Sequence, residues 1–349
     1  MRLPSGIFNQ NYDQDNAIFR TSLQKGLLAA GILFGLCIPF MADSFWMTII
    51  VTTLCTIIAA LGIQILTGYC GQLTSGHAGF VAVGAYTSAI LTFKLGLAFW
   101  IAVPLAVLTA GLIGLFVGLA SIRLKGFYLI ISTIAAQVII LYIIIHWTAL
   151  TGGSYGMTAP APKIGDFAFN DLTSYYYIVF VCLLAATYFT KNLVRTNVGR
   201  AFVAVRDNDL AAKVMGVNVT AYKLLAFFIG CALAGLGGAL MAHSRGVVTT
   251  DTYTLTESFW YLGYIIIGGI GTVTGSYFGV LFIVILSQGI SLLLSALSGV
   301  FIGAASLLGP LLMIVMGGVM AVFLIFEPRG LANRWTLFKT YYRLWPFAN

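Results

Sequence analysis

Long apolar stretches alternate with short polar connections along most of the chain. A helix needs about 20 largely apolar residues to cross the hydrocarbon core of a bilayer. Ten stretches approach this length, although the first is short and the pair after residue 257 is separated by a glycine-rich break. The pattern predicts an all-α, polytopic membrane protein of about ten transmembrane helices with re-entrant or broken Gly-rich segments. The predicted spans are 26–42, 45–66, 74–93, 97–120, 127–147, 174–190, 223–243, 258–270, 274–297 and 304–326.

The same pattern defines the domain organisation. One transmembrane domain covers 26–326, preceded by a polar segment at 1–25 and followed by a polar tail at 327–349. The informative polar connection inside the domain is 191–222. Glycines concentrate at 68–84, 152–156 and 268–279, which indicates close helix contact or unwound backbone. G-x-x-x-G spacings occur at Gly31/Gly35, Gly114/Gly118, Gly275/Gly279 and Gly299/Gly303. Helix packing alone is the favoured interpretation for each of them.

Composition agrees with a membrane protein. Of the 349 residues 60% are hydrophobic and only 8% are charged, whereas soluble domains carry about 25% charged residues. This excludes a disordered chain, a disulfide scaffold and an ordinary soluble enzyme. The five cysteines are scattered through apolar or Gly-rich stretches, where cysteine behaves as a small hydrophobic side chain. They indicate neither a metal site nor a disulfide framework.

The basic balance has a topological explanation. With ten spans, 15 of the 18 Lys and Arg residues fall on one side, and only Lys94, Lys163 and Arg245 fall on the other. Cytoplasmic loops carry the excess of Lys and Arg, so both termini are predicted to be cytoplasmic. The net charge of +8 is then explained without a nucleic-acid partner.

The predicted spans contain almost no ionisable side chains, which disfavours an ion-coupled carrier. No G-x-x-x-x-G-K-[ST] loop and no H-E-x-x-H motif occurs. Transport against a gradient would therefore need energy from a partner. Neutral polar side chains within and beside the spans can line a path for an uncharged solute, or they can tie helices together, which is favoured for most of them. These candidate path residues are Gln64, Gln72, Ser132, Thr133, Gln137, Tyr264 and Gln288.

The segment 191–222 predicts a short amphipathic helix from Arg200 to Met215. Ala201, Val205, Ala212 and Met215 can share one side of it. Gly216 suits the helix end, and Asn218 suits the turn that follows. Such a helix fits a groove on a soluble protein, and the alternative is an anchor lying at the membrane surface.

Six motifs follow one another along the chain. They are Gly68-Tyr69-x-Gly71-Gln72-Leu73-Thr74-Ser75-Gly76-His77-Ala78-Gly79-Phe80, Thr151-Gly152-Gly153-x-x-Gly156, Gly199-Arg200-Ala201, Arg206-Asp207-Asn208-Asp209, Gly268-Gly269-x-Gly271-Thr272 and Pro328-Arg329-Gly330-Leu331. Together they resemble the LivM-type permease subunit of the branched-chain amino acid family of ABC importers, and the resemblance spans roughly 45–335 in consistent order. One departure is that the acid expected directly before the Ala211-Ala212 pair is replaced by Leu210, with Asp209 one position earlier.

The resemblance implies a permease subunit, not an enzyme, in a bacterial or archaeal cytoplasmic (inner) membrane. It implies a second homologous (LivH-like) permease, two ABC ATPase subunits (LivG/LivF-like) that bind ATP and Mg, and an extracytoplasmic solute-binding protein. The chain itself would hold no cofactor, and besides these proteins it would contact membrane lipid. The solute would be a branched-chain or other neutral amino acid, or a urea, amide or aromatic acid. The alternative is an ATP-independent facilitator or ion-coupled secondary carrier of a neutral solute.

The resemblance also implies two docking regions. The coupling helix would contact the ATPase through Gly199, Arg200, Arg206, Asp207, Asp209, Ala211, Ala212 and Gly216. The solute-binding protein is expected at the opposite face. Its predicted contacts are Gly152, Gly153, Asp166, Asp171, Arg245, Asp251 and Glu257.

Overall fold

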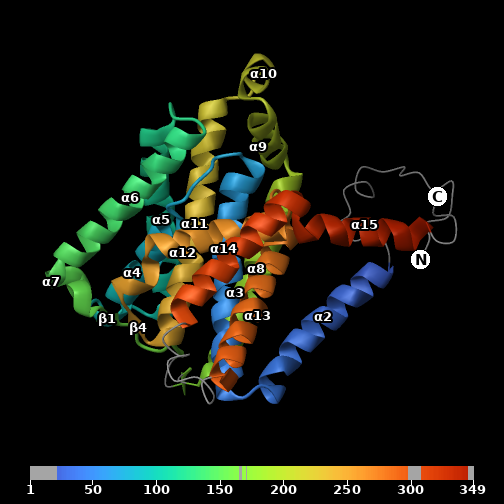
Figure 1. Ribbon diagram of the computed structural model, residues 1–349. Coiled ribbons are helices and arrows are strands. Elements are labelled where there is room, and N and C mark those ends of the chain that lie inside the picture. Colours follow the sequence, from blue (N-terminus) through green and yellow to red (C-terminus); the bar gives the residue numbers. More distant parts are fainter. Residues whose placement is uncertain (1–21, 165–166, 170, 298–307, 345–349) are drawn as a thin grey trace.

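The structure, a computed structural model, describes residues 22–164, 167–169, 171–297 and 308–344. Most of this part of the chain is helical, and the long helices form a bundle (Figure 1). In lipid each backbone N–H and C=O group must be paired within the protein, which selects helices for the apolar stretches. The helices are α2 (Ser22–Met41), α3 (Ser44–Ile63), α4 (His77–Phe93), α5 (Phe99–Ser121), α6 (Phe127–His146), α7 (Thr148–Thr151), α8 (Leu172–Arg195), α9 (Asn197–Asp207), α10 (Asp209–Val214), α11 (Val219–Arg245), α12 (Leu255–Gly268), α13 (Val273–Leu297), α14 (Leu308–Phe326) and α15 (Gly330–Leu344).

Helix α11 lies at the centre of the bundle, packed against α3, α4 and α5. Glycines allow the backbones to approach closely. A Cβ atom built on Gly84 of α4 would lie 2.2 Å from the carbonyl oxygen of Gly235 in α11, and one on Gly62 of α3 would lie 2.3 Å from the carbonyl oxygen of Gly230. Because the bulk lipid offers no hydrophobic driving force between helices, this close contact is a main source of their association.

Two of the glycine pairs confirm the packing interpretation. For the pair Gly31/Gly35 of α2 it is not confirmed, since a Cβ built on Gly31 would meet no neighbouring atom of the described residues within 4 Å. Gly114 and Gly118 of α5 lie against Cys231 and Phe227 of α11. Gly275 and Gly279 of α13 lie against backbone of the α12 region, and a Cβ on Gly279 would be 1.8 Å from a carbonyl oxygen there. The predicted pair Gly299/Gly303 lies outside the described residues.

The predicted count of ten spans is not confirmed. Each predicted stretch overlaps a described helix. Within the described part of the chain, however, six helices are long and apolar enough to cross a membrane alone. They are Ser44–Tyr69, Phe99–Ser121, Phe127–His146, Leu172–Arg195, Val219–Arg245 and Val273–Leu293. The bent pair α14 and α15 would add one more, while α4 and the apolar part of α2 are shorter. Helix α12 has only 14 residues. The sequence pattern shows which stretches are apolar, but the length of each helix depends on where the helical backbone ends, which the pattern does not show.

The expected irregular segments occur where glycines cluster. Helix α3 continues into a π-helical turn η1 (Gln64–Tyr69), after which residues 70–76 are not helical and are mostly buried. Their polar groups have protein partners: the Ser75 N–H donates to the Thr133 hydroxyl at 3.1 Å, and the Thr67 hydroxyl donates to the Gln72 carbonyl at 3.0 Å. Buried irregular backbone is tolerated in a membrane protein when it is paired in this way.

The end of the bundle that carries α7 has two short antiparallel strand pairs. Strand β1 (Met157–Thr158) pairs with β4 (Val247–Val248), and β2 (Lys163–Ile164) pairs with β3 (Phe167–Ala168). Two 3₁₀ turns, η2 (Gly153–Tyr155) and η3 (Thr250–Tyr253), flank them. The strands are a small addition to the predicted all-α architecture. We call this end, with 147–164 and 246–254, the strand end; Figure 1 shows it opposite α10.

His243, near the C-terminus of α11, fixes the strand end to the bundle. Its Nδ1 atom lies 2.8 Å from the carbonyl oxygen of Pro160, and its Nε2 atom lies 2.7 Å from the hydroxyl of Ser88 in α4. The Pro160 carbonyl can only accept, so Nδ1 carries the proton and Nε2 accepts from Ser88. His243 is therefore a hydrogen-bonded histidine that joins α4, α11 and the strand end.

Candidate functional site

The connection between α8 and α11 forms two helices where the sequence predicted one. Helix α9 ends at Asp207, and Asn208 is extended and starts α10: its Oδ1 atom accepts from Leu210 N–H at 3.1 Å and Ala211 N–H at 3.0 Å. Asparagine favours this N-cap geometry because its side chain replaces a missing helical acceptor. Gly216, at φ +85°, turns the chain back toward α11, as expected for a helix end. Figure 1 shows α9 and α10 at one end of the bundle.

The buried and exposed sides of this pair differ from the predicted arrangement. Ala201, Val205 and Ala212 are buried as expected. Met215 is 82% exposed, so its prediction as a member of the buried face was wrong. A single continuous helix would have placed Met215 beside Ala212, but the break at Asn208 and the end of α10 at Val214 change its direction.

The outward side of α10 is apolar. Val214 is 87% exposed, and Leu210 and Met215 are similarly exposed beside it. Ala211 and Lys213 are exposed as well. Contiguous exposed apolar side chains at one end of a bundle are typical of a protein–protein contact. We call Leu210, Val214 and Met215 the apolar tip.

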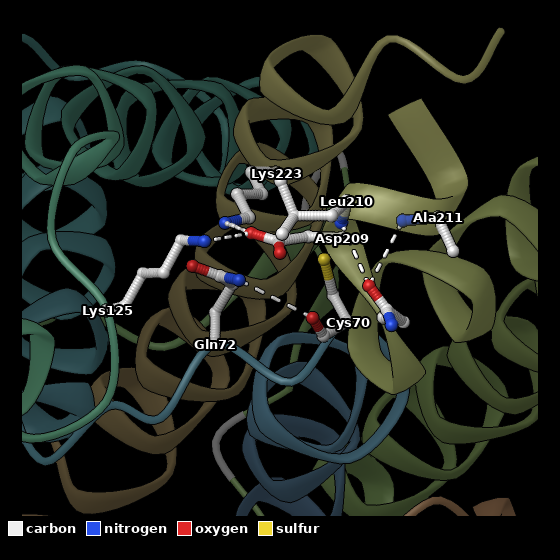
Figure 2. A network of polar contacts seen from close by, with 8 residues as sticks. Cys70, Gln72, Lys125, Asp209, Leu210, Ala211 and Lys223 are labelled. Carbon is white, nitrogen blue, oxygen red and sulfur yellow. Dashed lines mark hydrogen bonds and ion pairs between the residues drawn. The ribbon is translucent and has the colours of Figure 1, made fainter. Parts of the chain in front are cut away.

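The inward side of α10 is charged. The Asp209 carboxylate lies 2.5 Å from Lys125 Nζ, in the α5–α6 connection, and 3.6 Å from Lys223 Nζ, near the start of α11 (Figure 2). We call these three residues the Asp209 cluster. The side chain of Lys125 is 64% exposed and that of Lys223 is 10% exposed. The Lys125 ammonium, which donates to Asp209, holds the pKa of that carboxyl below its ordinary value.

Arg206, at the end of α9, also points toward the bundle. Its Nη1 atom donates to the Gly68 carbonyl at 3.0 Å, and its Nε atom donates to Asp207 at 2.9 Å. Glycines make room for it: a Cβ on Gly71 would lie 2.8 Å from Arg206 Cγ, and one on Gly271 would lie 3.0 Å from Nη1. Both glycines have positive φ, which other residues rarely adopt. Two separate glycine-rich motifs therefore meet at one arginine.

A cleft of about 320 Å³ lies between this segment and the bundle. Leu129 and Val205 supply apolar wall, and Gln72 and the Cys70 backbone supply polar wall. Figure 2 shows Gln72 and Cys70 beside the Asp209 cluster, with the Gln72 amide 3.5 Å from the Cys70 carbonyl oxygen. The attachment of α10 to the bundle is thus partly ionic and borders open space, unlike the close packing around α11.

Of the remaining coupling-helix candidates, one is buried against the bundle and three are exposed. Gly199 is buried, and a Cβ there would lie 2.1 Å from the Val194 carbonyl oxygen. Arg200 is exposed and bonds Asn197 of its own helix. Asp207 and Gly216 are exposed. The docking role of this set stays a prediction, but the geometry directs Arg206 and Asp209 inward.

Two of the predicted path residues lie inside the bundle as bridges. Gln64 donates to the carbonyls of Gly269 at 3.0 Å and Thr272 at 2.7 Å. Gln137 donates to the carbonyls of Tyr253 and Thr254 at 3.0 and 3.1 Å. Both side chains are buried, and their bonds join segments far apart in the sequence.

The other candidate path residues lie at various depths. Thr133 and Gln72 are buried, whereas Ser132, Tyr264 and Gln288 are half-buried. Ser132 is 2.9 Å from the hydroxyl of Ser121. Their assignment to a path stays a prediction.

The candidates for binding-protein contact lie mainly at the strand end. Gly152 and Gly153 have positive φ at the end of α7. Asp171, Arg245 and Asp251 are exposed, and Glu257 in the first turn of α12 is half-buried. Asp166 lies outside the described residues. Their docking role also stays a prediction.

Lys125 and Lys223 were missed as functional candidates by the sequence analysis, which counted them only as cytoplasmic charges. A signal was present for Lys223: it is a lone cation at the start of a 27-residue apolar helix. A cation that folding buries needs a carboxylate nearby. The sequence does not show which of several acids that is.

Comparisons with known proteins identify a family of permease components. Residues 45–325 match the family described as "Branched-chain amino acid transport system / permease component". The high-affinity branched-chain amino acid transport permease LivM of Salmonella typhimurium is 31% identical over 335 residues, 89% of this chain and 75% of that protein. A probable LivM of Methanocaldococcus jannaschii is 27% identical over 52% of this chain and 54% of its own.

Other relatives carry a different name. An autoinducer 2 import system permease, LsrC, of Klebsiella pneumoniae is 31% identical over 49% of this chain and 50% of its own. No solved structure matches the chain.

Proposed function

Because the chain belongs to the family of branched-chain amino acid transport permease components, and is a LivM-type permease with no ATPase role of its own, we propose that it forms half of the membrane path of an ATP-driven importer. Two ATPase subunits would bind at the α10 end, and a second, homologous permease would complete the path. The match over 89% of the chain to a LivM protein carries this proposal.

The distribution of charge supports the orientation. Lys125, Arg206 and Lys223 lie at the α10 end, together with Lys213 of α10 itself. At the strand end or directly beside it the cations are Lys163, Arg245 at the end of α11, and Lys94, which donates to the Ala149 carbonyl. The positive-inside rule then favours a cytoplasmic α10 and an extracytoplasmic strand end. The proposal also includes the predicted topology of the chain, with ten membrane spans and both termini on the cytoplasmic side.

A branched-chain or other neutral amino acid is the proposed solute. The match to LivM covers 89% of this chain, whereas the match to LsrC of Klebsiella pneumoniae covers 49%. A neutral solute is also consistent with the scarcity of charged side chains in the predicted spans. The solute-binding protein, docked at the strand end, would make the selection among solutes.

The apolar tip is the proposed contact with an ATPase. Apolar side chains that seat in a groove supply most of the binding energy of a short helix. The test is co-purification of tagged permease with the ATPase subunits encoded beside its gene. We expect Val214→Asp to abolish co-purification and Tyr155→Asp, at a side chain 98% exposed at the strand end, to leave it intact. Retention of the ATPase by Val214→Asp would refute this contact.

Transport is tested in proteoliposomes. The complete complex with its binding protein should accumulate leucine, isoleucine or valine when ATP is enclosed on the cytoplasmic side. The permease alone should accumulate none, since an ATP-driven mechanism needs the partner's hydrolysis. Accumulation by the permease alone would instead indicate a carrier.

A further inference from the structure

A coupling helix must bind the ATPase and also connect to the transmembrane bundle, and the two sides of α10 differ in a way that suits these two roles. The side away from the bundle presents Leu210, Val214 and Met215. The carboxylate of Asp209 lies on the other side, between Lys125 and Lys223 (Figure 2). A carboxylate already paired with two ammonium groups of its own chain is poorly placed to bind a partner protein.

Lys223 gives Asp209 a particular role. This lysine is 10% exposed, and the described ion pairs give it a single carboxylate, that of Asp209. An ammonium group buried without a counter-charge is strongly unfavourable. The pair therefore favours α10 and the start of α11 remaining together. The largely exposed Lys125 pairs with the same carboxylate, which links α10 to the α5–α6 connection as well.

Packing elsewhere leaves α10 few other attachments. Helix α9 buries Gly199, Ala201, Phe202 and Val205, whereas α10 buries only Ala212 among its residues. The cleft of about 320 Å³ beside the Asp209 cluster leaves room for small movements of α10. Helix α11, in contrast, is packed against α3, α4 and α5 along the bundle. The chain itself joins α10 to α11 through residues 215–218. Beside this covalent link, Asp209 supplies a side-chain link from α10 to α11 and to the α5–α6 connection.

We propose that Asp209 is a positioning residue that transmits movement of α10 to α11 and to the α5–α6 connection through Lys223 and Lys125, and that it does not hold the ATPase. The inference rests on the proposed function, because the movement comes from an ATPase bound at the apolar tip. The substitution of Leu210 for the expected acid before Ala211-Ala212 fits this division: the outward position is apolar, and the acid one residue earlier points inward.

The experiment uses the complete complex in proteoliposomes with its binding protein. It measures ATPase co-purification and the stimulation of ATP hydrolysis by leucine-loaded binding protein. For Asp209→Asn we expect normal co-purification and a loss of stimulation of about tenfold, within the range typical of coupling between sites. Asp209→Glu keeps the charge and should retain most of the stimulation. Asp43→Asn, at an exposed acid before α3, is the matched control and should behave as the wild type.

A second variant guards against misfolding. In Asp209→Asn/Lys223→Met the buried cation is removed together with its counter-charge, so the bundle should fold. The ion pair that links α10 to α11 is still missing in this variant. We expect this variant to keep the ATPase and to remain poorly stimulated. Restored stimulation in the double variant would overturn the proposal, because it would show that only the unpaired lysine had caused the defect.

The remaining outcomes separate the two proposals. Loss of the ATPase in Asp209→Asn and in the double variant would make Asp209 a docking residue, which overturns this inference and leaves the proposed function intact. Wild-type stimulation in Asp209→Asn would also overturn it. Failure of the wild-type permease to retain any ATPase would refute the proposed function, and the inference with it.

Discussion

The two ends of the bundle attach their irregular segments by different forces. At the strand end, neutral hydrogen bonds from His243 and the β1–β4 pairing hold residues 157–160 against buried side chains. At the α10 end, the Asp209 cluster and Arg206 hold a two-helix segment beside a cleft. Neutral hydrogen bonds in a packed region depend on exact placement, whereas contacts between long charged side chains tolerate displacement. The difference fits the proposed function, in which α10 moves and the strand end stays in place.

The largest effect on stability is expected at the strand end. His243→Ala removes both ring nitrogens, leaves Pro160 O and Ser88 without their partner, and opens a cavity. Intramembrane bonds of about 0.6–1.7 kcal/mol each and a cavity term together give a loss of about 3 kcal/mol. Thermal unfolding in detergent measures this as a lower midpoint.

The control is His146→Ala. This histidine is exposed, and its described contacts are with Tyr142 of its own helix, through the backbone carbonyl and the ring. Its removal should therefore change stability by less than about 0.5 kcal/mol. Equal midpoints for the two variants would show that His243 does not hold the strand end, and the comparison of the two ends would fail.

A smaller loss is expected in the Asp209 cluster. Asp209→Ala leaves Lys223 without its carboxylate, and because Asp209 is 24% exposed we expect about 2 kcal/mol, less than for a fully buried pair. Lys223→Met should be nearly neutral, since Asp209 keeps Lys125. The double variant Asp209→Ala/Lys223→Met should recover most of the lost stability. The unfolding midpoints of the wild type, the two single variants and this double variant form a double-mutant cycle.

Lys125→Ala tests the exposed arm of the same cluster. An ion pair with a largely exposed lysine contributes about 0–1 kcal/mol, so its midpoint should fall less than that of Asp209→Ala. If the double variant Asp209→Ala/Lys223→Met is as unstable as Asp209→Ala, the unpaired Lys223 is not the cause of the loss, and this explanation is contradicted.

The smallest effect concerns pH. The pKa of Asp209 lies below its ordinary value of 3.8, so the ionised pair adds stability above that pH, and the contribution is lost as pH falls through the lower folded-state value. The midpoint difference between the wild type and Asp209→Asn should therefore be constant from pH 8 to pH 5 and shrink below about pH 4. A difference that already shrinks between pH 7 and pH 5.5 would show that the pKa is not depressed.

Sequence patterns predicted the fold class and the region of the site well, and individual contacts poorly. Apolar stretches located the helices, and the motifs around Gly71 and Gly271 marked the irregular segments correctly. The single helix predicted for 200–215 was wrong because Asn208 caps a new helix, and apolar spacing is insensitive to such a break. The role of Asp209 was open, since its partners are 84 and 14 positions away in the sequence.

The amino-acid sequence by itself determined that this chain is a helical membrane protein of the LivM type, because apolar length, scarce charge and glycine motifs are local properties. The tertiary structure alone decided which side of α10 faces outward, and that Gln64, Gln137 and His243 serve as bridges inside the bundle. These depend on distances between segments far apart in the chain. A side chain's type limits the bonds it can make, but only folding places a carbonyl or an ammonium within reach of it.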